Sequence, residues 1–66
     1  MLVTFTYMIE VETGYKHLGA RHWLQAFDDK ESALKWLSNK GYEQINKNSF
    51  KKHDEGKMFY VGTLIE

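Results

Sequence analysis

The 66-residue chain contains no cysteine and no proline. Without cysteine it has neither disulfide bonds nor thiolate metal sites, and cysteine usage says nothing about its redox compartment. No apolar run is long enough to span a membrane, and the N-terminus lacks the basic start and apolar middle of a secretory signal. Nine basic residues balance nine acidic ones, so no net charge steers the chain toward nucleic acid or an anionic membrane. These absences predict a cytoplasmic protein with no membrane partner.

The chain is rich in aromatic residues, which make up 15% of it. A chain of this length buries only about 60% of its unfolded surface, near the lower limit for folding on a single core. Large aromatic side chains, or oligomerisation, can supply the missing buried area. The length therefore predicts one small domain that spans residues 1–66.

Residues 27–42 carry the signals that start, maintain and end a helix. Asp28 can accept hydrogen bonds from the first-turn amides, and Glu31 can reach back to the Asp28 amide, as in a capping box. Gly41 suits the left-handed position that follows a helix. The apolar residues that share one side of this helix are Ala33, Leu34, Trp36 and Leu37. The pattern predicts a helix over about 29–40 with one buried side.

The remaining segments indicate strands. Residues 2–12 alternate, and after a turn at 13–14 and a loop at 15–19 a second strand is expected at about 20–27, paired with the first as a hairpin. After the helix, a strand begins in residues 42–46, is interrupted by a polar run, and continues in residues 50–53.

The last strand is expected at residues 57–65, after a hairpin loop in which Gly56 has a positive φ. It is apolar on both faces, which is typical of a central strand. Together the elements predict an α+β fold of the order ββαββ, a four-stranded, mainly antiparallel sheet with one helix packed on one face.

One helix can cover only one face of such a sheet, yet the strands carry apolar side chains on both. The uncovered face is expected to hold a contiguous apolar patch, which on a small protein usually marks a binding surface or a dimer interface. The alternative is that strand curvature and long side chains cover it. The expected protein-binding anchors are Trp23, Leu24, Met58 and Tyr60.

Motifs for catalysis and for metal or cofactor binding are missing. The three histidines lack the spacing of a metal site, the serines lack a nucleophile turn, and the glycines form no phosphate loop. We therefore expect no enzymatic activity, no metal site and no cofactor. Capture of a small anionic ligand between subunits stays open, without a motif to support it.

Nucleic-acid binding is the alternative function. Between residues 47 and 60 lysines alternate with aromatic residues, a combination that grips phosphates and stacks bases, although two acidic residues lie among them. The residues expected to bind RNA or single-stranded DNA are Lys47, Phe50, Lys51, Lys52 and Lys57.

Residues 34–61 also resemble HicA-type mRNA interferase toxins in the order helix, Gly-aromatic, strand and Asp-Gly hairpin. The resemblance rests on residues 39–43, Lys47-Asn48-Ser49 and 53–57, and covers under half of the chain. Those toxins place a catalytic His after the Gly-Ser of the second strand, whereas Phe50 and Lys51 follow Ser49 here. The N-terminal hairpin is also foreign to that family, so the resemblance implies RNA binding at most and no nuclease activity.

The leading hypothesis is a small, non-enzymatic protein-interaction module that docks its sheet face or an edge strand on a protein partner or, as a homodimer, on a second copy of itself. The excess of lysine over arginine and the lack of proline resemble proteins of AT-rich genomes and their phages. The function hypothesis is therefore a phage-type or mobile-element regulator or inhibitor.

Overall fold

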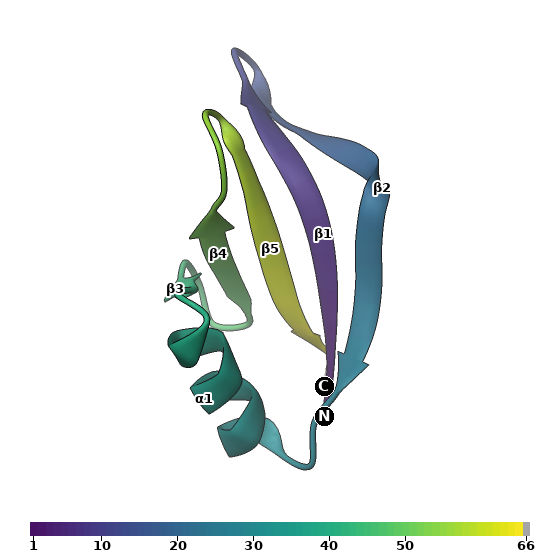
Figure 1. Ribbon diagram of the computed structural model, residues 1–66, viewed down its shortest axis with the longest axis vertical. Coiled ribbons are helices and arrows are strands. Elements are labelled where there is room, and N and C mark those ends of the chain that lie inside the picture. The colour runs from purple at the N-terminus through teal and green to yellow at the C-terminus, as the bar shows by residue number, and fades with distance from the viewer. Residues whose placement is uncertain (66) are drawn as a thin grey trace.

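The structure is a computed structural model that describes residues 1–65, apart from the Ala20 side chain. Its elements follow in the order β1 (Leu2–Val11), β2 (Gly14–Ala26), α1 (Lys30–Asn39), β3 (Glu43–Gln44), β4 (Ser49–His53) and β5 (Met58–Ile65) (Figure 1). In these residues the strands form one five-stranded sheet of order β2-β1-β5-β4-β3, and all neighbours are antiparallel. The fold class is α+β.

The expectation of four strands is wrong, because the polar run after the helix reverses the chain instead of interrupting one strand. The Asn46 side-chain oxygen accepts a hydrogen bond from the Asn48 amide at 3.1 Å, which closes an Asx turn. The Ile45 amide then donates to the Ser49 carbonyl at 2.9 Å. Residues 43–44 therefore pair with 50–51 as a separate strand, β3.

The first two strands pair as the predicted hairpin, but β2 starts at Gly14 and includes the residues expected to form a loop. The pairing contains one irregularity. Thr6 pairs with His22 and Met8 with His17, so two steps along β1 match five along β2. The extra residues form a bulge that lets β2 continue to the tip of the hairpin.

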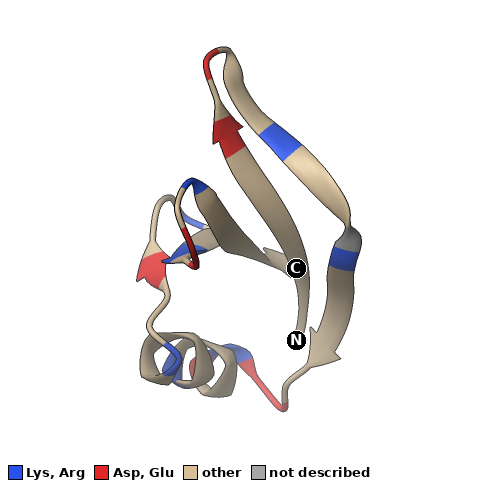
Figure 2. Ribbon diagram, turned by 45° about the horizontal axis from the view of Figure 1, so that its top comes forward, with Lys and Arg blue, Asp and Glu red and all other residues tan. Residues whose placement is uncertain are grey.

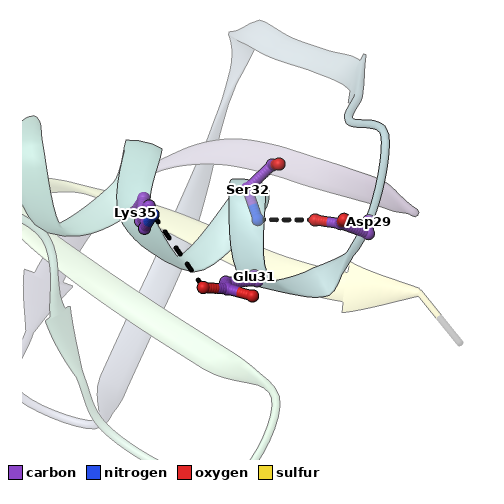
Figure 3. A network of polar contacts seen from close by, with 4 residues as sticks. All are labelled: Asp29, Glu31, Ser32 and Lys35. Carbon is purple, nitrogen blue, oxygen red and sulfur yellow. Dashed lines mark hydrogen bonds and ion pairs between the residues drawn. The ribbon is translucent and has the colours of Figure 1, made fainter.

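The helix begins one residue later than predicted. Its N-cap is Asp29 and not Asp28, because the Asp29 carboxylate accepts a hydrogen bond from the Ser32 amide at 2.8 Å (Figure 3). This bond favours the ionised carboxylate and lowers the pKa of Asp29. Lys35 and Glu31 form an i,i+4 ion pair at 3.9 Å on the exposed side.

The helix ends as predicted, with Gly41 in the left-handed region at φ +91°. The Gly41 amide donates to the Ser38 carbonyl at 3.1 Å and the Tyr42 amide to the Leu37 carbonyl at 2.9 Å. These two bonds form a Schellman motif. They turn the chain so that the Tyr42 ring lies 6.2 Å from the Trp36 ring.

The core lies between α1 and one face of the sheet. Its buried apolar residues are Val3, Phe5, Ala33, Leu37, Phe50 and Leu64. Phe5 pairs across the sheet with Gly62, and Gly62 pairs with Phe50. A Cβ atom on Gly62 would lie 2.9 Å from the Phe5 ring and 3.3 Å from the Leu37 side chain. Gly62 therefore makes room for the Phe5 ring and for the helix above it.

β5 is the middle strand of the sheet, as its two apolar faces predict. The ten-residue α1 lies beside only one end of the sheet, while the β1–β2 hairpin extends far beyond it (Figure 1). We call the face that packs on α1 the helix face and the opposite one the open face. Odd-numbered residues of β1, such as the buried Val3 and Phe5, belong to the helix face, and even-numbered ones belong to the open face.

We predict that Gly62→Ala destabilises the fold by about 1–3 kcal/mol, since the added methyl group must displace the Phe5 ring or the Leu37 side chain. Chemical denaturation of the two proteins measures the difference. The control is Gly19→Ala, where the described residues place no heavy atom within 4 Å of the new Cβ. Equal stability of Gly62→Ala and the parent would contradict this packing.

Candidate interaction surface

The outer side of β2 is the long free edge of the sheet. Within residues 1–65, β2 pairs only with β1, and nothing is drawn beyond it in Figure 1. The stretch from His22 to Ala26 pairs with residues 2–6 of β1 without a register shift, because the bulge lies before it. Its side chains are exposed except that of Gln25, which is half-buried. This segment therefore offers both backbone and side chains to an incoming group.

Two terminal hydrogen bonds show which backbone groups of this segment point outward. The Met1 amino group donates to the Phe27 carbonyl at 3.1 Å, and the Phe27 amide donates to the Met1 carbonyl at 2.8 Å. Hydrogen-bonded and non-hydrogen-bonded pairs alternate along an antiparallel ladder. Inward groups therefore belong to odd-numbered residues here, and the amides and carbonyls of His22, Leu24 and Ala26 point to the free edge.

The bonds on the other side of β1 agree with this assignment. The Glu10 amide donates to the Lys57 carbonyl of the chain preceding β5 at 2.9 Å. Even-numbered residues of β1 therefore turn their backbone groups toward β5, and odd-numbered ones turn theirs toward β2. The three outward residues of β2 are left without a strand partner in the described chain.

The two edges of the sheet differ in how they resist further pairing. The β3 edge is only two residues long and carries the charged Glu43. A short edge and a charged side chain both commonly block strand addition. The segment 22–26 of β2 contains no lysine, arginine, aspartate, glutamate or proline. Figure 2 shows this end of β2 without charged residues. Residues 22–26 of the β2 edge therefore lack the charges and prolines that usually block the addition of another strand.

Exposed apolar side chains gather on the open face beside this edge. Leu24 is 62% exposed, Ile65 45% and Leu2 44%. Leu2 pairs with Ile65, and Thr4 pairs with Leu24, so these side chains share one end of the open face. We call the set Leu2, His22, Leu24, Ala26 and Ile65 the edge patch.

The rest of the open face is more polar than expected. Thr4, Thr6 and Thr63 lie between the edge patch and the rings of Phe59 and Tyr15 farther along this face, so polar side chains interrupt the predicted apolar surface. A groove of about 530 Å³ runs along β1 and β2 beside the edge patch. It is lined by Thr4, Phe5, Thr6, His22, Trp23 and Leu24.

On the helix face, aromatic contacts hold the same segment of β2 in place. The Trp23 ring stacks on the buried Phe5 ring at 4.8 Å between centroids, with 15° between planes. It also meets the Tyr60 ring edge-on at 5.9 Å, and its indole nitrogen donates to the Gln25 side chain at 3.4 Å. The edge segment is therefore anchored to the core before any partner binds.

Beyond the reach of α1, the helix face carries a polar and aromatic network. The Tyr7 hydroxyl donates to Asp54 at 2.5 Å and contacts the Met58 sulfur at 3.4 Å. The Arg21 guanidinium lies 5.0 Å from the Tyr7 ring centre and donates to the Tyr60 hydroxyl at 3.1 Å. The network joins β2, β1, β5 and the β4–β5 loop where no helix covers the sheet.

Contacts within this network raise the pKa values of Tyr7 and Arg21. The hydrogen bond to Asp54, together with desolvation, raises the pKa of Tyr7 to about 12. The hydrogen bond to Tyr60 raises the pKa of Arg21 above its ordinary value. Tyr7 thus remains a neutral hydrogen-bond donor and Arg21 a cation at neutral pH, so neither group can act as a general base.

The four predicted protein-binding residues do not share one surface. By register, Trp23, Met58 and Tyr60 lie on the helix face and Leu24 lies on the open face. Tyr60 and Met58 contact Tyr7, while Leu24 belongs to the edge patch. Sequence reasoning missed His22, Ala26 and Ile65 as parts of this surface. Strand alternation places the side chains of His22, Leu24 and Ala26 on one face, but the free edge becomes visible only with the strand order.

The residues predicted for nucleic acid are spread over both faces. Phe50 is only 6% exposed and belongs to the core, so its ring is not available to stack on a base. The Lys51 ammonium lies over the Phe59 ring at 4.4 Å, and the Lys52 ammonium lies 5.8 Å from the Tyr42 ring. These two neighbours point to opposite faces of β4. Lys47 and Lys57 lie in two different turns.

A hollow of about 410 Å³ beside β4 is the other depression near these lysines. It is lined by Gly41, Glu43, Ile45, Lys51, Lys52 and His53. The Glu43 carboxylate offsets part of the positive charge that an anion would need. Burial raises the pKa of the nearby Tyr42 to about 12, so its hydroxyl adds no negative charge at neutral pH.

Residues 1–65 contain no group of three or more acidic or histidine side chains placed to hold a metal ion. In the same residues no helix has the length and apolar character needed to cross a membrane. No family model, curated protein or solved structure matches the chain. The resemblance to HicA-type toxins therefore has no support from these comparisons.

We predict that the Tyr7 phenol titrates near pH 12 and that Asp54→Ala moves this titration toward the ordinary value of 10. The substitution removes both the hydrogen-bond acceptor and the nearby negative charge that disfavour the tyrosinate. The raised pKa also means that the unfolded state ionises first, so the contribution of Tyr7 to stability is lost as pH rises from 10 to 12.

Ultraviolet absorbance of tyrosinate follows the titration, and Tyr7→Phe identifies the transition that belongs to this residue. Tyr42 is the internal control, because its raised pKa stems from burial and should not respond to Asp54→Ala. A parent protein whose Tyr7 ionises near pH 10 would contradict the hydrogen bond to Asp54.

Proposed function

We propose that the chain is a non-enzymatic protein-interaction module that binds a strand of a protein partner along the β2 edge. The observation that supports this proposal is the row of outward backbone groups at His22, Leu24 and Ala26, on an edge segment without charge or proline. A partner strand would satisfy these groups and extend the sheet, which is the usual mode of strand addition.

The edge patch supplies the side-chain contacts that make binding selective. Backbone hydrogen bonds give affinity for any extended chain, and the side-chain contacts select among chains. Leu24, Leu2 and Ile65 offer apolar contacts on the open face, and the groove of about 530 Å³ beside Leu24 has room for a side chain of the partner. The role of this module is that of a small cytoplasmic regulator or inhibitor that acts by occupying its partner's strand.

We predict that an immobilised protein retains a protein partner from the lysate of its native cells, that nuclease treatment does not change this, and that Leu24→Lys abolishes it. A lysine at this position places a charge within the apolar contact. The edge patch includes Leu2 and Ile65, near both ends of the described residues, so attachment should use Glu55→Cys, which gives the chain its single cysteine. The β4–β5 loop that holds Glu55 lies at the other end of the sheet in Figure 1.

The matched control is Ile45→Lys, which adds the same charge at a side chain that is 53% exposed and belongs to the opposite edge of the sheet. It should retain the partner at the parent level. Two results would contradict the proposal and support the nucleic-acid alternative. The first is loss of retention after nuclease treatment. The second is loss of retention with Lys51→Glu and Lys52→Glu while Leu24→Lys has no effect.

A further inference from the structure

We infer that the strand accepted by β2 is β2 of a second copy of this chain, in an antiparallel pair whose two-fold axis passes beside Leu24. The inference rests on the proposed function and names its partner. It depends on the positions of the outward groups, on the charges at each end of the segment and on the bulge in β2.

The outward groups fit this arrangement because they are centred on Leu24. Around a two-fold axis at Leu24, this residue faces Leu24 of the second copy, and His22 faces the second copy's Ala26. All three residues turn their amides and carbonyls to the edge, so every one of these pairs is a hydrogen-bonded pair. The arrangement forms about six backbone hydrogen bonds between the copies.

The charges are compatible with this register. No lysine, arginine, aspartate or glutamate lies in the paired segment, so no like charges face each other. Just beyond it, Arg21 faces Phe27 of the second copy, one residue from that copy's Asp28. Neither end of the pair therefore places like charges opposite each other.

The side chains also complement one another across the axis. On the open face the two Leu24 side chains meet and bring the two edge patches together. On the helix face Trp23, which is 40% exposed, lies opposite Gln25 of the second copy. Trp23 is already held by its stack on Phe5, so little freedom is lost when the copies pair.

Other two-fold registers along β2 are poorer. An axis at Trp23 or at Gln25 would pair only two of the three outward residues with one another. An axis at His22 would require pairing through the bulge between His17 and His22, where the strand is irregular. An axis at Ala26 would run past the end of β2 and place Leu24 opposite Asp28. The axis at Leu24 uses the three outward residues and avoids both problems. Because the pair is closed by symmetry and the β3 edge is short and charged, it leads to a dimer and not to a fibre.

The register is tested with charges placed at the two positions that would face each other. Light scattering after size exclusion, over a range of concentrations, measures the dimer dissociation constant of the parent and of two double variants. The first variant combines His22→Lys with Ala26→Lys, and the second combines His22→Glu with Ala26→Lys. Both positions are exposed in the structure, and both variants change the same residues.

We predict that the parent is a dimer and that the Lys–Lys variant dissociates at least about tenfold more readily than the Glu–Lys variant, since each charge pair occurs twice in the dimer. Within one chain the two positions lie about 13 Å apart along β2, beyond the Debye length of about 8 Å at physiological salt. The two charges within one chain therefore contribute little to the difference between the variants, and the difference should shrink at high salt.

A parent that stays monomeric at every concentration, or two double variants with equal dissociation constants, would overturn the inference. If the parent is monomeric but retains a partner that Leu24→Lys abolishes, only the identity of the partner is wrong. If Leu24→Lys changes neither the dimer nor the retention, the proposed function fails as well.

Discussion

The contact of the Phe5 ring with Gly62 is the constraint on which the rest of the structure depends. Because Gly62 has no side chain, the Phe5 ring and the Leu37 side chain can both pack close to its Cα. The Phe5 ring also stacks on Trp23 in the edge strand. A single buried aromatic residue thus connects the helix, the central strand and the outermost strand.

The short helix determines what the remaining sheet must do. α1 covers one end of the helix face, and beyond it Tyr7, Tyr60, Arg21 and Asp54 bind one another across three strands and a loop. These contacts connect the side chains where no helix covers them. Exposed apolar groups such as Leu24 and Trp23 lie on the open face and at the β2 edge, where our proposal places the partner.

Local patterns predicted much of this fold. The helix and its end at Gly41, the two long hairpins, the positive φ of Gly56 and the central place of β5 follow from short stretches of sequence. The two errors arose where neighbouring residues could form alternative hydrogen bonds. Asp29 replaced its neighbour Asp28 as the cap, and the Asx turn at Asn46 made two strands out of one.

The candidate site was harder to predict because it depends on strand order, which long-range pairing decides. Alternation shows that Trp23 and Leu24 lie on opposite faces, but it does not show that β2 is an edge. Nor does it show that Phe50, set among lysines, faces the core, since that follows from its pairing with Gly62 below the helix.

In the dimer that we propose, the outward backbone groups of β2 bind β2 of a second copy. Amide hydrogen exchange followed by nuclear magnetic resonance measures this pairing. At high protein concentration we expect the Leu24 amide to exchange as slowly as the inward amides of Trp23 and Gln25, and we expect dilution to accelerate Leu24 selectively. A Leu24 amide that exchanges rapidly at every concentration, beside protected Trp23 and Gln25, would contradict it.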